Sequence, residues 1–229
     1  MIDVTTLDGR RELSERAVQD LAKRLTGRLL RSSDEGYDQA RLIWNRAIDR
    51  RPALIACCAG ADDVRAAVGW AREHDLLVSV RGGGHNVTGH AVCEGGLMID
   101  LSALKTARVD AVKTRLTAGP GLTWGELDTA TQRHGLATTG GIISTTGVAG
   151  LTLGGGHGWL MRKHGLACDN LPAVELVTAD GALVRTSAEE NPELFWGVRG
   201  GGGNFGVVTT FEFALHPSRR SWRVCCSIR

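Results

Sequence analysis

Residues 76–90, LLVSVRGGGHNVTGH, join an apolar run directly to three glycines, a histidine and an asparagine. A short apolar run bounded by glycine predicts a buried β-strand, and residues 53–58 predict another one upstream. Between the two, residues 60–74 carry apolar side chains at helical spacing. Strand, helix and strand in this order predict a βαβ unit. The loop at residues 82–85 then follows the carboxyl end of a strand, where α/β sheets usually bind ligands.

The three consecutive glycines before His85 suggest an anion site. Successive glycines allow several backbone N–H groups to turn toward one anion, which suits a pyrophosphate and needs no lysine. The alternative is a tight turn followed by a histidine that is merely solvated. The residues themselves leave both interpretations open.

A second glycine-rich stretch, GGIISTTGVAGLTLGGGHG at residues 140–158, is nearly free of charge. Its composition is poor for a helix or a strand, so we expect it to be mostly irregular. Its glycines permit close approach of a large flat ligand, and its aliphatic side chains offer apolar walls. The alternative is an irregular loop of the core, although a loop of this length without a function is uncommon in a compact domain.

A third stretch, GGGNFG at residues 201–206, matches the pattern G-x-G-x-x-G. A dinucleotide-binding fingerprint of that kind needs a strand before it and a helix after it. Here residues 191–198 predict a helix before it, and residues 205–215 predict a strand after it. We therefore reject a Rossmann site, and the G-x-x-x-x-G-K-[ST] pattern of a P-loop is absent from the sequence.

The remaining pattern predicts a chain that mixes helices and strands. Residues 11–30 predict an amphipathic helix, and residues 124–134 predict another with Thr123 as its N-cap. Short strands are expected at residues 97–101, 107–110, 115–118, 174–177 and 182–186. The pair Asp180-Gly181 joins the last two as a hairpin. The predicted fold class is α+β, with one βαβ subdomain and one strand-rich subdomain.

Composition and charge exclude several classes of protein. The 229 residues carry a net charge of +2 and are 42% hydrophobic, which excludes a strongly basic nucleic-acid binder and a disordered chain. No run of about 18 apolar residues predicts a transmembrane helix. The six cysteines form no CxxC pair, and His85, His90 and Cys93 fit no zinc spacing, so we expect no metal site. The charged N-terminus lacks a signal-peptide core, which favours a cytoplasmic location.

Three segments resemble one family when taken together: RGGGHNVTGHAV, GLATTGGIISTTGVAGLTLGGGHGWL and ELFWGVRGGGGNFGVV. They are similar, in this order, to the FAD-linked oxidases related to berberine bridge enzyme and 6-hydroxynicotine oxidase. The resemblance implies the two-subdomain, PCMH-type FAD-binding fold of the vanillyl-alcohol oxidase superfamily over residues 41–217. Its subdomains are expected at about 41–84 and 85–217. Residues 1–40 are then an N-terminal helical segment and residues 218–229 an atypical tail.

By this resemblance, FAD is the cofactor, and His85 corresponds to the histidine that bonds covalently to the flavin 8α-methyl carbon. The loop around the pyrophosphate corresponds to Gly82, Gly83, Gly84 and Asn86. Two further cofactor-binding residues of the same segment are Arg81 and Gly89. The stretch along the isoalloxazine and ribityl groups corresponds to Gly140, Thr146, Gly147, Gly150, Gly155 and Gly158. The backbone near the flavin corresponds to Val207 and Val208.

One departure from the family pattern limits the covalent chemistry. Some relatives carry a second, cysteinyl bond to the flavin, but Ile143 stands at that position here, so we predict a single histidyl link. Thr146 takes the place of a residue that influences access of oxygen to the flavin. Cys168 is expected to be a small buried residue. His157 could face the cofactor, whereas His164 is expected to cap or pack.

The resemblance implies an oxidoreductase whose flavin accepts hydride from a small hydroxylated or amine substrate and passes the electrons to oxygen. The catalytic base is expected in a substrate domain that follows in longer relatives, so no catalytic residue is assigned. One alternative is an inactive flavin-binding remnant, since the unusual end SRRSWRVCCSIR suggests a frameshifted or truncated product after Pro217. Another is an NADPH-dependent reductase of the same fold, against which His85 argues. Neither nucleic acid nor a membrane is expected as a partner.

Overall fold

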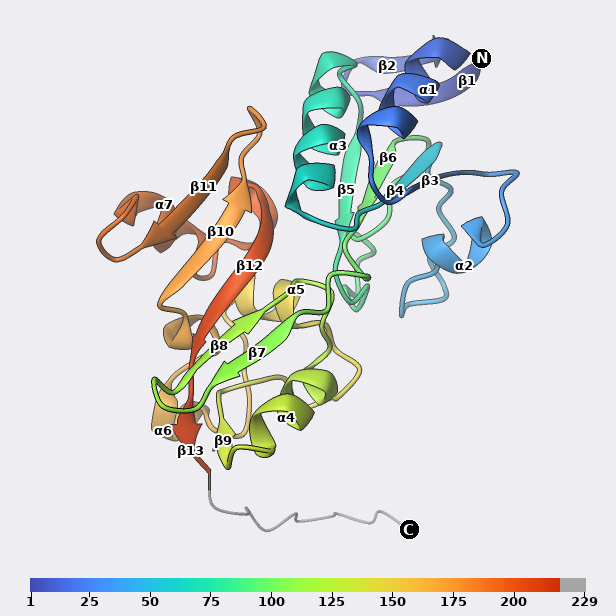
Figure 1. Cartoon of the computed structure of the whole chain (residues 1–229). Coiled ribbons are helices and arrows are strands. Elements are labelled where there is room, and N and C mark those ends of the chain that lie inside the picture. Colours follow the sequence, from blue (N-terminus) through green and yellow to red (C-terminus); the bar gives the residue numbers. More distant parts are fainter. Residues whose placement is uncertain (219–229) are drawn as a thin grey trace, which may run out of the picture.

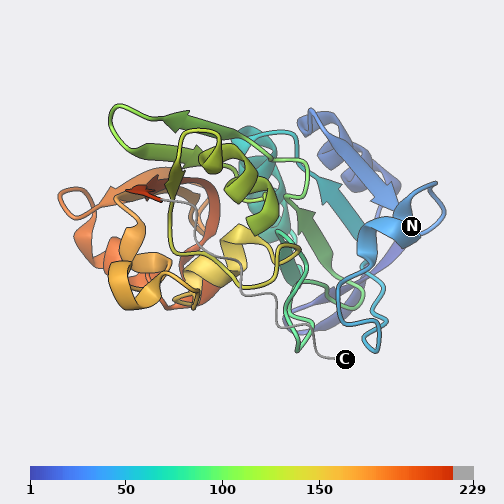
Figure 2. The ribbon, with the colours of Figure 1, turned by 90° about the horizontal axis from the view of Figure 1, so that it is seen from below.

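The structure, a computed structural model, describes residues 1–218 and shows two lobes, each built on its own sheet (Figure 1). The chain begins with a hairpin of β1 (Ile2–Thr6) and β2 (Gly9–Leu13), followed by helix α1 (Glu15–Arg24). A four-stranded sheet forms the first lobe and a five-stranded sheet forms the second. Seen from below, the two lobes lie side by side (Figure 2).

The first sheet joins four strands in the order β3 (Arg28–Arg31), β4 (Leu54–Cys57), β6 (Leu97–Asp100) and β5 (Val78–Arg81). Strands β4, β6 and β5 are parallel, and β3 pairs antiparallel with β4 at the edge. Helix α3 (Ala61–Glu73) links β4 to β5, which confirms the predicted βαβ unit, although β6 inserts between its two strands.

Both faces of the first sheet are covered, which explains why its central strands are apolar except for Asp100 at the end of β6. In β4, Leu54 and Ala56 belong to one hydrophobic cluster with Trp70 of α3. Ile55 belongs to a second cluster with Tyr37 of helix α2 (Tyr37–Arg41). Successive strand residues point to opposite faces, so neighbouring residues serve different cores.

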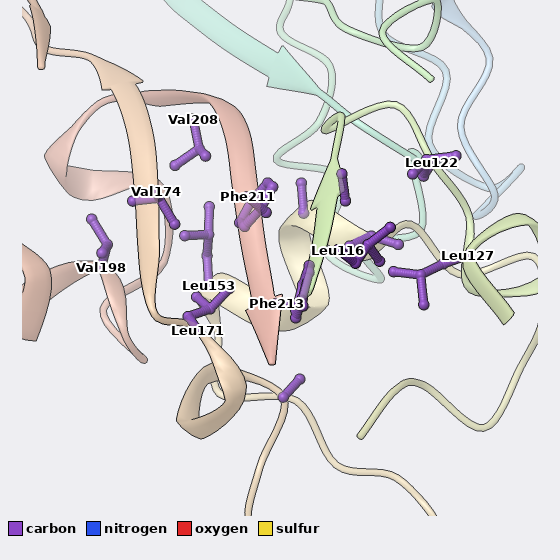
Figure 3. Close-up of a cluster of buried hydrophobic side chains, with 14 of the residues drawn as sticks. Leu116, Leu122, Leu127, Leu153, Leu171, Val174, Val198, Val208, Phe211 and Phe213 are labelled. Carbon is purple, nitrogen blue, oxygen red and sulfur yellow. The ribbon is translucent and has the colours of Figure 1, made fainter. Parts of the chain in front are cut away.

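The second sheet is antiparallel throughout, in the order β11, β10, β12, β8, β7. Its strands are β7 (Ala107–Asp110), β8 (Arg115–Ala118), β10 (Ala173–Val177), β11 (Leu183–Ser187) and β12 (Val207–Ala214). The β10–β11 hairpin turns at Asp180-Gly181, as predicted, and Gly181 has a φ of 84°. Figure 3 shows the core of this lobe, where Phe211 and Phe213 of β12 lie beside Leu116 of β8.

Several short elements complete the second lobe: α4 (Trp124–Gln132), β9 (Leu136–Ala137), α5 (Val148–Leu153), α6 (Met161–His164), α7 (Pro192–Val198) and β13 (His216–Pro217). Helix α4 begins at the predicted N-cap with a capping box, in which the Thr123 N–H donates to the Glu126 carboxylate at 2.9 Å. Gly135 follows the helix with a φ of 67°.

Helix α3 also joins the two lobes. Val177 of β10 and Val207 of β12 belong to the same hydrophobic cluster as Ala67 and Trp70 of α3. The next residue, Val208, belongs to the core of the second lobe. The first two residues of β12 therefore contribute one side chain to each core.

Three sequence-based bounds differ from the structure. The helix expected at residues 11–30 is limited to α1, because the residues on either side pair as β2 and β3, and the segment 1–40 is therefore not simply helical. The boundary expected between residues 84 and 85 falls inside the first sheet, since β6 pairs with β4 and β5. The stretch 140–158, expected to be irregular, contains α5.

Within residues 1–218, no helix is both long and apolar enough to cross a membrane. The prediction of an atypical tail at residues 218–229 falls, apart from Ser218, outside the described residues. The same holds for Cys225 and Cys226.

Candidate functional site

Two glycine-rich loops, one from each lobe, touch through their backbones. The first, residues 82–90, follows β5 directly, as predicted, and the second, residues 140–158, includes α5. A Cβ atom added to Gly147 would lie 2.6 Å from the Cα atom of Gly83, closer than real Cβ atoms come. This close approach requires glycine at both positions. The structure thus brings together the two stretches that the sequence singled out.

The second loop is fastened to the start of α4 by backbone hydrogen bonds. Trp124 donates to the carbonyl of Thr146, and Val148 donates to the carbonyl of Leu122, both at 2.9 Å. At the ends of the loop, Gly158 packs so closely on the carbonyl of Gly140 that no Cβ atom fits. The loop is therefore closed upon itself by backbone contacts.

Three buried hydroxyl groups line this region without a hydrogen-bond partner among the described residues. They belong to Thr138, Thr139 and Thr152. Buried polar side chains are nearly always paired, and leaving one unpaired costs about 1–3 kcal/mol. A polar ligand that reached these hydroxyls would recover that free energy. Sequence reasoning missed them, because an isolated threonine carries no signal in the pattern.

Arg81, the last residue of β5, forms an ion pair with Asp100 of β6. Its Nε and Nη2 atoms donate to the two carboxylate oxygens of Asp100 at 3.0 and 2.7 Å, and Nη1 donates to the carbonyl of Leu42 at 3.1 Å. The side chains of Arg81 and Asp100 are only 12% and 5% exposed. Arg81, which the resemblance places among the cofactor-binding residues, thus uses its guanidinium to anchor the start of the first loop.

His85 lies against an aromatic residue from another part of the chain. Its imidazole stacks on the indole of Trp44, with ring centroids 4.6 Å apart and planes inclined by 19°. The Nε2 atom of His85 is buried and has no hydrogen-bond partner among residues 1–218. The hydrogen-bonding capacity of this nitrogen is therefore unused within residues 1–218. Sequence reasoning missed Trp44, since no periodic pattern connects it to His85.

Asn86 and Gly89 shape the rest of the first loop. The Asn86 side-chain oxygen accepts from Thr88 Oγ1 at 2.8 Å and from the His90 N–H at 3.0 Å. Gly89, with a φ of 77°, packs on Ile48 and leaves too little room there for a Cβ atom. Both residues hold the loop in its turn.

Gly200, the residue before the third glycine stretch, is bonded to the second loop. The Gly200 N–H donates to the carbonyl of Leu153 at the end of α5, at 3.0 Å. A 3₁₀ turn, η2 (Gly202–Phe205), then leads into β12 at Val207 and Val208, which are both buried. With α7 before the turn and β12 after it, the order of elements agrees with the rejection of a Rossmann site.

The remaining predicted residues of the second loop differ in their surroundings. Gly150 of α5 is exposed, and nothing lies within 4 Å of a Cβ atom added there, whereas Gly155 is buried with a φ of 100°. His157 and Ile143 are exposed. The described residues contain no group of three or more His, Cys, Asp or Glu side chains able to hold a metal ion.

Cys168 is buried, and burial raises the pKa of its thiol, which agrees with a small structural residue. Burial likewise raises the pKa values of Cys58 and Cys93. His164 packs, as expected, since it stacks on His216 with ring centroids 3.7 Å apart. His216 Nε2 in turn lies 2.7 Å from the side-chain oxygen of Asn170.

Two lobes meet through glycine-rich loops, beside an imidazole nitrogen that has no partner in the described part of the chain, and this arrangement suits a large nucleotide cofactor. The family described as FAD binding domain matches residues 52–187, more than half of the chain, and this chain belongs to that family of FAD-linked oxidoreductases.

Known proteins agree with this assignment. The chain is 41% identical over 196 residues to (R)-6-hydroxynicotine oxidase from Paenarthrobacter nicotinovorans. The matched region covers 86% of this chain and 43% of that protein. The crystal structure of 6-hydroxy-D-nicotine oxidase from Arthrobacter nicotinovorans matches with a TM-score of 0.83 at 41% identity, over 84% of this chain and 43% of that chain. The structure of BBE-like 1 from Physcomitrella patens matches with a TM-score of 0.83 at 30% identity, over 87% and 44% of the two chains.

These likenesses confirm the predicted family and its FAD-binding fold. The chain spans less than half of the length of these relatives.

The residues present fit the cofactor of the family. Gly82, Gly83 and Gly84 carry no side chains of their own over their backbone N–H groups, and Gly83 lies against the backbone of Gly147. His85 Nε2 and the three threonine hydroxyls are buried groups that still lack a partner within residues 1–218. A ligand with both a charged and an aromatic part matches this combination of donors, hydroxyls and apolar walls.

Proposed function

We propose that this chain is the FAD-binding portion of an oxidase in which His85 bonds covalently to the flavin. One observation supports this most directly: the Nε2 atom of His85 is buried and has no hydrogen-bond partner within residues 1–218, two residues beyond the contact between the glycine loops. A flavin bound there would supply a two-electron acceptor for hydride. Gly82, Gly83 and Gly84 would hold the pyrophosphate through their backbone N–H groups.

The residues of the second loop would flank the flavin itself. Gly140, Thr146, Gly147, Gly150, Gly155 and Gly158 are assigned to it by resemblance, as are Val207 and Val208 at the start of β12. Ile143 cannot form a cysteinyl bond, so His85 would be the single covalent link. Arg81 would act by holding the first loop on β6, and Asn86 and Gly89 by keeping its turn.

We further propose a small hydroxylated or amine substrate as the hydride donor and oxygen as the acceptor. The relative from Paenarthrobacter nicotinovorans is named as an oxidase of a hydroxylated compound, 6-hydroxynicotine, which supports this class of substrate. No catalytic base is assigned among residues 1–218. An exposed imidazole in the second loop, that of His157, has no assigned role in the reaction.

Acid denaturation tests the covalent link. We expect flavin fluorescence, and the added mass of one FAD, to stay with the denatured wild-type chain. His85→Ala should lose this signal while still binding FAD before denaturation. His90→Ala, an exposed histidine of the same loop, is the matched control and should keep the bound flavin. Flavin retained in His85→Ala, or absent from the wild type, would contradict the proposal.

Anaerobic titration tests the redox function separately. Bleaching of the flavin absorbance by a hydroxylated or amine substrate, and its return with oxygen, are the expected results. Covalent flavin without any bleaching would indicate an inactive flavin-binding chain instead.

A further inference from the structure

The indole of Trp44 stacks on the imidazole of His85. The two rings stack at 4.6 Å between centroids. Trp44 is 57% exposed, whereas the preceding residue, Ile43, is buried in the cluster beside the first sheet. The indole is therefore placed at the surface of the loop that carries His85, and packing of the core does not account for it.

The backbone around Trp44 is fastened to the same loop. The Trp44 N–H donates to the carbonyl of Gly84 at 2.9 Å, and the Asn45 side-chain amide donates to the carbonyl of Val87 at 2.8 Å. Further along, Arg50 Nη1 donates to the carbonyl of Gly89 at 3.0 Å. These bonds hold the segment that carries Trp44 against the backbone on both sides of His85, and the indole then contacts the imidazole through the ring stack.

Stacking restricts the motion that matters for a nucleophile. The torsion that turns an imidazole about its Cβ–Cγ bond is broad and poorly restrained by itself. An aromatic ring held nearly parallel to one face favours the stacked orientation over others. The edge that carries Nε2 is thereby kept in the buried position where the structure places it. Reactions between aligned groups depend steeply on such orientation.

We propose that Trp44 is a positioning residue for attachment of flavin to His85, an inference that rests on the proposed function. In this step a bond forms between an imidazole nitrogen of His85 and the 8α-methyl carbon. One methyl hydrogen and the imidazole N–H hydrogen leave as protons, together with two electrons. Dioxygen takes up the two electrons and two protons and becomes hydrogen peroxide. Trp44 forms no bond in this step and acts only by orienting the ring.

The test measures the rate at which covalent flavin appears after FAD is added to the flavin-free full chain. Trp44→Ala should slow attachment about tenfold, the factor expected for losing an aromatic pair at the strong end of the usual range. Trp44→Phe keeps a ring and should restore most of the rate. Trp196→Ala is the matched control, since Trp196 is a tryptophan 77% exposed on α7, and its rate should equal that of the wild type.

A second measurement separates positioning from general damage. FAD affinity is compared between His85→Ala and His85→Ala/Trp44→Ala, in which attachment is impossible. Equal affinities, within about twofold, are expected if Trp44 only orients His85. A weaker affinity in the double variant would show that Trp44 supports the loop as a whole and would overturn the proposal.

An unchanged rate in Trp44→Ala would also overturn it, while leaving the covalent link itself intact. Absence of covalent flavin from the wild type would instead overturn the proposed function and this inference with it. The two failures are therefore distinguished by the wild-type chain alone.

Discussion

The first glycine loop is held by side-chain bonds as well as backbone hydrogen bonds, whereas the second is held by backbone hydrogen bonds. Around residues 82–90, Arg81 forms an ion pair with Asp100, and the Asn45 side-chain amide donates to the carbonyl of Val87. Around residues 140–158, backbone hydrogen bonds tie the loop to α4. Loss of side-chain bonds should therefore loosen the first loop, whereas the second loop should respond to atoms added in the space that its backbone occupies.

Breaking the anchor of the first loop should have the largest effect on stability. Arg81→Met leaves the carboxylate of Asp100 buried without its charged partner, which costs about 3–5 kcal/mol of the free energy of unfolding. Urea-induced unfolding measures this loss. The double variant Arg81→Met/Asp100→Leu should recover most of it, because the unpaired charge is then gone.

A surface pair provides the control. Arg185→Met removes an ion pair with Glu212 whose partners are 41% and 37% exposed, and it should cost less than about 1 kcal/mol. If Arg81→Met cost no more than this control, the anchor would not hold the first loop as described.

Filling the contact between the two loops should have the next largest effect. Gly83→Ala places a Cβ atom 2.6 Å from the backbone nitrogen of Gly147, and we expect a loss of about 2–3 kcal/mol together with weaker FAD binding. Thermal unfolding and flavin fluorescence measure the two effects.

Gly69→Ala is the matched control for this substitution. Gly69 lies inside α3 with nothing within 4 Å of an added Cβ atom, so alanine should stabilise the helix by about 0.5–1 kcal/mol. Equal stabilities for Gly83→Ala and the wild type would mean that the loops do not meet at Gly83.

Local patterns predicted much of this fold and part of its site. The strands β4 and β6, the helix α3 and the Asp180-Gly181 hairpin follow from periodicity and turn residues that are close together in sequence. The bounds of α1 could not be predicted, because Leu29 and Leu30 pair with β4, which lies much further along the chain. Local hydrophobic spacing cannot distinguish a helix end from a strand whose partner is distant.

In the site, too, features that are local in sequence could be predicted, whereas contacts between distant segments could not. The first loop was predicted because its glycines directly follow a strand. The pairing of Arg81 with Asp100 depends on β6 lying beside β5, which sequence order does not reveal. The stack of Trp44 on His85 likewise depends on how the segment after α2 crosses the loop.

The smallest expected effect is the pH dependence of stability that comes from the stacked pair His164 and His216. Burial lowers the pKa of both His164 and His216 below the ordinary value, and their mutual proximity lowers that of His216 further. Below the unfolded pKa of about 6.5, the unfolded chain takes up protons that the folded chain resists. Stability therefore falls as the pH drops through that value, and the melting temperature should decrease by about 2 °C between pH 7.5 and 5.5.

The double variant His164→Gln/His216→Gln should remove this part of the pH dependence. A melting temperature that rises on acidification in the wild type but not in the double variant would contradict the assigned direction.

The first two residues of β12 determine how the chain could be divided into two fragments. Val207 completes the core of the first lobe and Val208 that of the second, although both come late in the sequence. A fragment of residues 1–106 would expose the face of α3 that Val177 and Val207 normally cover. Such a fragment should aggregate when it is produced alone. It should associate with a fragment of residues 107–218 when the two are produced together. The fold is therefore suited to fragment complementation, in which recovery of flavin binding shows that two separately encoded fragments have associated.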